Sequence, residues 1–244
     1  MPLTFPKPNE PIPPTDVSPR TLILYGPPKI GKTTVITSLP DYLLVELEPN
    51  GAKYVSAVKI ELDNILQIAQ VEDHFKKSNP KPTFRFLVVD TLDQLEVWAE
   101  LEATRRYKAS AIGSTFKGDS VLELPKGGGY FHLRNTFYEY FNRLRSLAPY
   151  TIFLGHVKDG LLGVEGKEVA SKDLDLTGKV KNIVCSYADA TGHAFRAKDG
   201  KFTVNFKTTD IANCGSRCAH LAGKEFVFDQ PATVENWKQL YPNL

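Results

Sequence analysis

The sequence predicts an α/β fold: a mostly parallel sheet flanked by helices, with antiparallel edge strands toward the C-terminus. Short, almost wholly apolar runs alternate with longer stretches of helical periodicity, which is typical of strands that helices cover on both faces. The late part of the chain instead alternates apolar and polar residues around a turn, as antiparallel hairpins do. At 244 residues the chain can form one domain with a substantial core.

Residues 1–20 are rich in proline and poor in core-forming residues. Proline lacks a backbone donor and holds the chain near the polyproline conformation. We therefore predict an extended arm over residues 1–20, followed by one domain over residues 21–244. A disordered tail is the simpler interpretation of the arm.

The elements of the domain follow in order. Strands are predicted at residues 21–25, 42–47, 84–89 and 150–154, and helices at 32–38, 62–77, 92–106 and 130–147. A hairpin is predicted at 194–208 around Asp199-Gly200. Two Gly- and Lys-rich stretches, 108–129 and 157–178, lack periodicity and are predicted as long loops. Loops of that length are usually functional or disordered.

Charge and cysteine content limit the classes of function. A formal net charge of +2 does not by itself indicate nucleic-acid binding. The three cysteines and the lack of a long apolar run predict an intracellular protein with reduced thiols, no signal peptide and no membrane contact. A zinc site at Cys214, Cys218 and His220 is the alternative, but it would have to recruit Cys185 from a predicted helix.

Residues 26–33 match G-x-x-x-x-G-K-[ST] between a predicted strand and a predicted helix, the context that this phosphate-binding loop requires. Gly26 and Gly31 are expected to let the backbone curl so that its amides face the β-phosphate. Lys32 is expected to reach the β- and γ-phosphates, and the Thr33 hydroxyl to coordinate Mg²⁺. The motif therefore predicts binding of ATP and Mg²⁺ by Gly26, Pro27, Pro28, Lys29, Ile30, Gly31, Lys32, Thr33 and Thr34, the last near the α-phosphate.

Two acids follow predicted strands. Asp90 ends the third strand, where a carboxylate holds Mg²⁺ through water beside the phosphate-binding loop. Asp93 is a rival, but the register puts it inside the next helix. Glu48 follows the second strand, which we interpret as the neighbour of the strand that precedes the loop. There Glu48 could activate the attacking water as a general base, whereas Glu46 lies inside the strand.

Together these residues resemble the RecA superfamily, and within it the phage-encoded RecA-like ATPases that act as single-strand annealing recombinases. The resemblance covers about residues 20–230, in GPPKIGKTT, LLVELEPNG, FLVVDTLDQL, GGGYFHLRNTF, IFLGHVKDG and NCGSR. It implies that Glu48 is the catalytic glutamate, that Asp90 is the second acid of the magnesium site and that His156 senses the γ-phosphate. Arg217 would reach the γ-phosphate of a neighbouring subunit, with Lys207 as the alternative.

The resemblance also places DNA-contacting loops after the third and fourth strands, where the two aperiodic stretches lie. Basic side chains there would follow a phosphate backbone, and Phe116 and Tyr130 would stack on bases; solvated lysines are the simpler interpretation. In filaments of this kind, Leu3 and Phe5 would dock on a neighbouring subunit. The predicted DNA contacts are Arg105, Arg106, Lys108, Lys117, Lys126, Lys158, Lys167, Lys172 and Lys179.

The predicted function is thus an ATP-dependent recombinase that binds single-stranded DNA, assembles into a ring or filament and hydrolyses ATP between subunits. A single-strand-binding protein is a further predicted partner, and the cytoplasm of a bacterial host the predicted compartment if the protein is phage-encoded. The alternatives are a nucleotide-switched assembly module with little turnover, a helicase-like hexamer and a small-molecule kinase. The late hairpin, in place of an arginine-rich lid, argues against a kinase.

Overall fold

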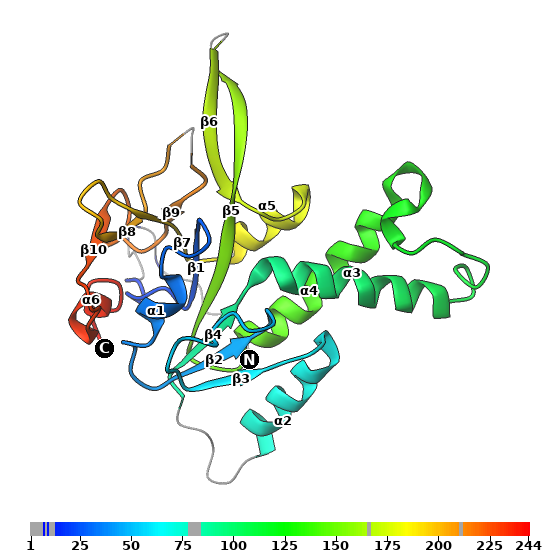
Figure 1. The fold of residues 1–244 in the computed structure, drawn as a ribbon, viewed down its shortest axis with the longest axis horizontal. Coiled ribbons are helices and arrows are strands. Elements are labelled where there is room, and N and C mark those ends of the chain that lie inside the picture. Colours follow the sequence, from blue (N-terminus) through cyan, green and yellow to red (C-terminus); the bar gives the residue numbers. More distant parts are fainter. Residues whose placement is uncertain (1–6, 8, 10–12, 78–83, 165–166, 210–211) are drawn as a thin grey trace.

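The computed structural model describes the chain except for residues 1–6, 8, 10–12, 78–83, 165–166 and 210–211 (Figure 1). Leu3 and Phe5 lie outside the described residues, so their predicted docking stays a prediction. The strands are β1 (Thr21–Gly26), β2 (Tyr42–Glu46), β3 (Lys59–Glu61), β4 (Phe86–Asp90), β5 (Tyr150–Val164), β6 (Lys167–Leu174), β7 (Ala190–Arg196), β8 (Phe202–Asn205), β9 (Gly215–Ser216) and β10 (Glu225–Phe228).

The helices are α1 (Lys32–Ile36), α2 (Ile68–Lys77), α3 (Leu92–Ala109), α4 (Gly128–Arg145), α5 (Gly178–Tyr187) and α6 (Val234–Lys238). Short 3₁₀ turns lie at Ile65–Gln67, Val121–Glu123 and Pro125–Gly127. In Figure 1, α3 and α4 extend together to one side of the sheet.

The described strands form one sheet in the order β10-β8-β7-β1-β5-β4-β2-β3, with β6 paired to β5 and β9 to β7. The central pairs β7–β1, β1–β5, β5–β4, β4–β2 and β2–β3 are parallel. The pairs β7–β8 and β8–β10 are antiparallel. This arrangement confirms the predicted fold class.

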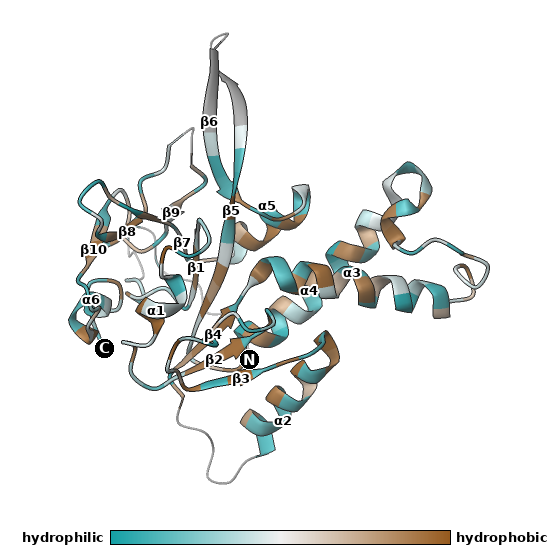
Figure 2. Cartoon of the chain, in the orientation of Figure 1, coloured by the Kyte–Doolittle hydropathy of each residue, from teal (hydrophilic) through white to brown (hydrophobic). Residues whose placement is uncertain are grey.

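Two apolar layers cover the sheet, because alternate residues of each central strand face opposite sides. In β1, Ile23 and Tyr25 pack with α2, α3, α4 and α5. Leu22 and Leu24 pack on the other face with α1 and α6. Figure 2 shows the apolar colouring of the central strands. Burial on both faces explains why these strands are continuous apolar runs rather than alternating ones.

The last helix is anchored to the helix that follows the phosphate-binding loop. Trp237 of α6 is fully buried, and its Nε1 donates to the Val35 carbonyl at 3.1 Å and to Ser38 Oγ at 2.9 Å. The tail of the chain therefore supports α1 directly.

The prediction of two long loops is wrong for most of their length. Residues 157–164 and 167–174 pair as the hairpin β5/β6, whose register joins Val157 to Leu174 and Val164 to Lys167, and which projects from the sheet (Figure 1). Residues 108–129 contain the end of α3, two 3₁₀ turns and the start of α4. A capping box at Ser120 and Glu123 holds the first of these turns. Backbone hydrogen bonds, which composition does not reveal, order both stretches.

Candidate functional site

The phosphate-binding loop lies between β1 and α1, as predicted, but its two glycines serve different purposes. Gly31 has a φ of +100°, a left-handed conformation that glycine adopts readily. Lys29 also has a positive φ, of 63°. Gly26 is needed for packing instead, because a Cβ there would lie 2.1 Å from the Ala194 carbonyl oxygen of β7. The curl of the loop thus depends on Lys29 and Gly31 rather than on Gly26.

Lys32 begins α1 and is largely buried. Its Nζ donates to the carbonyl oxygens of Gly26 at 2.8 Å and of Pro27 at 2.9 Å. Burial lowers the pKa of Lys32, and the nearby carboxyls of Asp90, Asp93 and Glu48 oppose that shift. A phosphate entering the loop would therefore replace two backbone contacts of this ammonium group.

Thr33 and Asp90 meet beside the loop. The Thr33 hydroxyl donates to Asp90 Oδ2 at 2.8 Å. Asp90 ends β4 and is 6% exposed, and burial raises the pKa of its carboxyl to about 6. A hydroxyl and a carboxylate are the hard oxygen donors that Mg²⁺ prefers, so these two side chains fit the predicted magnesium site.

Glu48 lies beside the same cleft, but the prediction that its strand neighbours β1 is wrong. The strand before it, β2, pairs with β4 and β3, so β4 and β5 lie between β2 and β1. Glu48 sits beyond the strand end, where its Oε1 accepts from the Thr91 hydroxyl at 2.8 Å. Glu46 is buried inside β2 and binds Lys59 Nζ at 2.8 Å. It therefore has a structural role.

His156 of β5 is held by Asp93, in the first turn of α3. The carboxylate lies 2.9 Å from the imidazole Nδ1 and accepts the backbone N–H of the same histidine at 3.1 Å. Glu48 Oε1 lies 3.7 Å from that Nδ1. The Asp93 hydrogen bond, chiefly, raises the pKa of His156. The three side chains bring ligand atoms within 4.8 Å of one another, so together they could also hold a cation.

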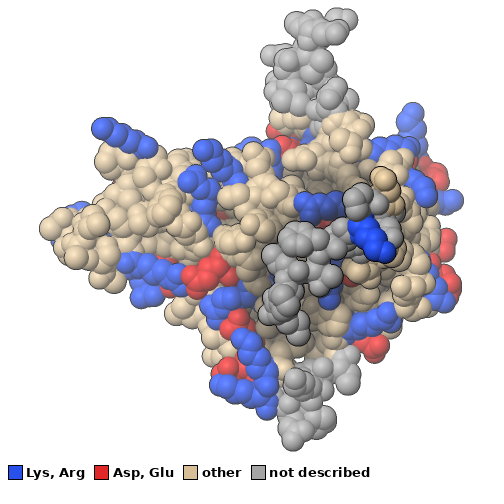
Figure 3. Space-filling view, turned by 180° about the vertical axis from the view of Figure 1, so that it is seen from behind, with Lys and Arg blue, Asp and Glu red and all other residues tan. Residues whose placement is uncertain are grey.

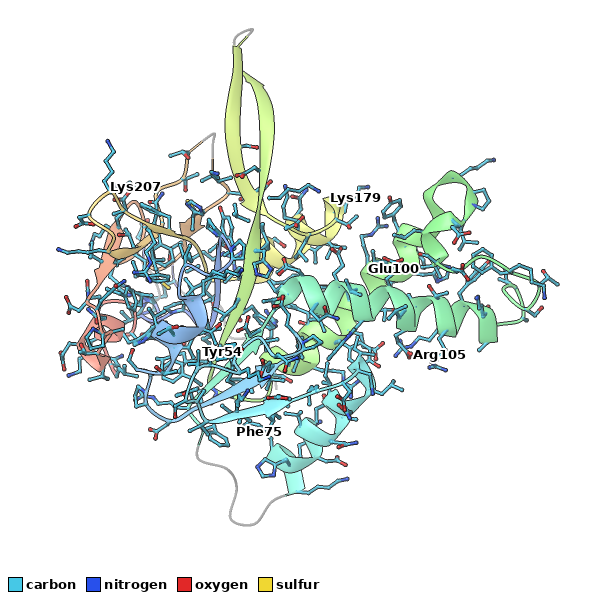
Figure 4. The ribbon with its side chains drawn as sticks, viewed as in Figure 1. Tyr54, Phe75, Glu100, Arg105, Lys179 and Lys207 are labelled. Atoms are coloured by element: carbon cyan, nitrogen blue, oxygen red, sulfur yellow. The ribbon has the colours of Figure 1, made fainter. Side chains whose placement is uncertain are left out.

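One cleft of about 460 Å³ is shared by the side chains of Lys32, Thr33, Glu48, Asp90 and His156. It is also lined by Tyr54, which is 93% exposed and labelled near α1 in Figure 4. The cleft is bounded by Pro28, Lys29, Gly31, Lys32, Thr33, Thr34, Glu48, Gly51, Tyr54, Val55, Asp90 and His156. A family model described as an AAA domain matches residues 18–218, a range that includes all of them. The chain belongs to the AAA domain family. No curated protein matches it at a significant level.

Some of the basic residues predicted to contact DNA in this AAA domain are neutralised by acids. Arg105 and Arg106 lie on α3 rather than on a loop, and each pairs with Glu102 at 2.7 Å. Arg106 also pairs with Glu139 at 2.6 Å. Both arginines thus belong to the predicted helix over 92–106, and assigning them to the loop that follows it is wrong.

Basic residues of the second predicted stretch, 157–178, also pair with acids. Lys158 pairs with Asp175 at 3.7 Å, and Lys172 pairs with Asp159, both lysines lying on the hairpin β5/β6. The side chain of Lys167 lies outside the described part of the structure. On the face seen in Figure 3, basic side chains are scattered with acidic ones among them. Within the described residues, the salt bridges found leave Lys108, Lys117, Lys126 and Lys179 without an acidic partner.

Arg217 lies at the end of the sheet opposite the phosphate-binding loop of its own chain. Its backbone N–H donates to the Asp189 carbonyl at 2.8 Å, just before β7 begins. Its guanidinium donates to the Ser186 carbonyl at 2.5 Å. Lys207, the alternative, pairs with Glu225 at 3.2 Å. Neither side chain lines the chain's own cleft, and the predicted action on a neighbouring subunit stays a prediction.

The residues of the zinc alternative make separate contacts. Cys214 donates to the Lys207 carbonyl at 3.0 Å, and His220 Nε2 lies 3.0 Å from the Leu240 carbonyl oxygen. In the described part of the chain, the cluster with metal-ligand geometry is the one at Glu48, and the cysteines are not in it. None of the described helices is long and apolar enough to cross a bilayer.

The roles of two residues near the loop are not predicted by the sequence. The sequence predicts Asp93 only as a rival magnesium ligand, but it lies in the first turn of α3 and contacts His156 of β5. Arg196, at the end of β7, donates through Nε to the Ile30 carbonyl of the loop at 2.8 Å. The sequence gives little indication of this contact, because an arginine before a hairpin turn is common on protein surfaces.

Proposed function

We propose that this protein hydrolyses ATP with Mg²⁺ in the cleft at the carboxyl ends of β1, β5 and β4. The observation that carries the proposal is the convergence, in one cleft, of Lys32, the bonded pair Thr33 and Asp90, and Glu48. Thr33 and Asp90 would hold Mg²⁺, which supplies positive charge to the phosphate oxygens when bound. The loop amides and Lys32 would bind the phosphates.

Glu48 would accept a proton from the attacking water. Its hydrogen bond from Thr91 fixes one carboxylate oxygen and leaves the other for that water. His156, oriented by Asp93, would place a donor at the same end of the triphosphate. A proton on His156 adds positive charge where negative charge develops in the transition state.

The test is phosphate release from ATP with and without Mg²⁺, in the wild type and in Lys32→Ala, with Lys53→Ala as a control at an exposed position outside the cleft lining. We expect magnesium-dependent turnover that Lys32→Ala abolishes and Lys53→Ala preserves. Undiminished hydrolysis by Lys32→Ala would refute the site. Nucleotide binding with negligible turnover and ATP-dependent assembly would assign a switch module instead.

We further propose that the ATPase binds single-stranded DNA and acts in annealing or strand exchange. A hollow of about 460 Å³ between the starts of α4 and α5 supports this. Arg134, Lys179 and the 41% exposed Tyr130 line it, and Figure 4 labels Lys179 at the start of α5. Cationic groups beside an exposed aromatic ring suit phosphate contact and base stacking without sequence preference.

The test is fluorescence anisotropy of a labelled oligothymidylate, with and without ATP, together with ATPase stimulation and an annealing assay. The double variant Arg134→Ala/Lys179→Ala should bind more weakly and show a smaller salt slope. Lys201→Ala, which removes a lysine that pairs with Asp199, is the control. Absence of both DNA binding and stimulation in the wild type would reject the recombinase proposal and leave the ATPase proposal intact.

Self-association with Arg217 acting on a neighbouring cleft is part of the same proposal. The Arg217 side chain is exposed at its hydrogen bond with Ser186, so it is accessible to a second copy. Light scattering with a non-hydrolysable ATP analogue should show assembly. Arg217→Ala should assemble but hydrolyse slowly, and hydrolysis unaffected by this change would exclude Arg217. Deleting residues 1–15 without changing oligomer size would exclude docking by Leu3 and Phe5.

A further inference from the structure

Arg196 approaches the phosphate-binding loop from the side opposite the acids. It ends β7, which pairs with β1 on one side, whereas β5 and β4, which supply His156 and Asp90, lie on the other side of β1. A triphosphate whose γ-phosphate faces Asp90 and His156 must therefore extend its α-phosphate and nucleoside toward β7.

The guanidinium of Arg196 is held firmly in this position. Nε donates to the Ile30 carbonyl at 2.8 Å, Nη1 donates to the Gly200 carbonyl at 3.0 Å, and the group lies over the Phe202 ring at 5.8 Å. Among the described residues, Nη2 has no hydrogen-bond partner, although it can donate twice. The arginine side chain is therefore fixed in position, and the N–H groups of Nη2 remain available to a ligand.

The remaining donors lie beside Gly31, one of the residues that line the cleft. A Cβ built on Gly31 would lie 2.8 Å from Arg196 Nη2 and 3.9 Å from the Thr34 Cβ. The guanidinium and Thr34 thus border the same space, and Thr34 is the loop residue expected near the α-phosphate. The absence of a side chain at Gly31 keeps that space open.

We propose that Arg196 binds the α-phosphate of the nucleotide from the β7 side, as a subsite separate from the acids of the γ end. The inference rests on the proposed nucleotide binding. The two N–H groups of Nη2 can donate to a phosphate oxygen, and little ordering is needed on binding because the bonds of Nε and Nη1 already fix the guanidinium plane. Because ATP and ADP share the α-phosphate, Arg196 contributes equally to both affinities.

The experiment is calorimetric titration of ATP, ADP and the two ATPαS diastereomers into wild type, Arg196→Gln and Arg196→Lys. Lys198→Gln is the matched control, because it removes a positive charge from the same exposed turn, and no contact of its side chain with the loop is present in the described structure. We expect Arg196→Gln to weaken ATP and ADP alike by about tenfold or more, equivalent to about 1.4 kcal/mol. Arg196→Lys should restore part of that loss, and Lys198→Gln should bind as the wild type does.

The thio-substituted nucleotides separate phosphate binding from mere support of the loop. Wild type should discriminate between the two ATPαS diastereomers, and Arg196→Gln should lose that discrimination. Weaker binding of every nucleotide with the discrimination intact would overturn the proposal, since a distorted loop alone gives that result. Unchanged affinity in Arg196→Gln would overturn it too. Wild type that binds no nucleotide would instead overturn the proposed function, and this inference with it.

Discussion

Asp90→Asn should make the ligand-free protein more stable while abolishing its magnesium-dependent hydrolysis. Burial raises the pKa of this carboxyl from its ordinary value of 3.8 to about 6. Between these pH values the folded chain holds a proton that the unfolded chain has released, so the wild type loses stability as the pH rises through this interval. The full difference corresponds to about 3 kcal/mol above pH ~6 and vanishes below pH ~4.

The asparagine carries no charge to desolvate, and its Oδ1 can still accept the Thr33 hydroxyl. The attraction of Lys32 is already contained in the shifted pKa of Asp90, so the expected gain stays at about 3 kcal/mol at pH 7.5. The assay is urea unfolding of both proteins in EDTA at several pH values. A variant no more stable than wild type at pH 7.5, or a stability difference that does not change with pH, would refute the reasoning.

Three further outcomes are expected. Glu48→Gln should keep nucleotide affinity, since its amide oxygen can accept from Thr91, and lose about 10²–10⁴-fold in turnover; phosphate release at the wild-type rate would show that another group is the base. Asp93→Asn should lower the pKa of His156, moving its NMR titration to lower pH, whereas an unmoved titration would contradict the Asp93 contact as its cause. Trp237→Ala should cost about 3–5 kcal/mol in chemical denaturation, because the ring is fully buried against α1, and a loss below 1 kcal/mol would contradict that packing.

Local pattern was enough to predict the central strands and the phosphate-binding loop. The apolar runs around Ile23 and Val88 are buried on both faces of the sheet, and such strands are recognisable without knowledge of their neighbours. The loop motif is equally local, since its glycine and lysine spacing reflects contacts with a single ligand. Asp90 followed from the same pattern, at the end of one of these strands.

Strand order and long-range contacts could not be predicted in the same way. The neighbour of β2 depends on which crossovers the chain takes, and nothing near Glu48 encodes them. The hairpin β5/β6 is rich in glycine and charge, so its composition resembles that of a loop while its backbone hydrogen bonds make a ladder. Arg196 and Ile30 are 166 positions apart in sequence. Their contact depends on the pairing of β7 with β1, which the residues near either position do not predict.

The location of Arg217 at the far end of the sheet has a consequence for symmetry. One surface of a protomer bears the cleft and the opposite surface bears this arginine, so a contact joining the two uses unlike patches on the two copies. A two-fold dimer would have to make both contacts at a single interface, which two patches on opposite surfaces of a protomer do not allow. An arginine that completes the cleft of another copy therefore requires head-to-tail growth, which ends only where the rotation between successive copies closes a cycle.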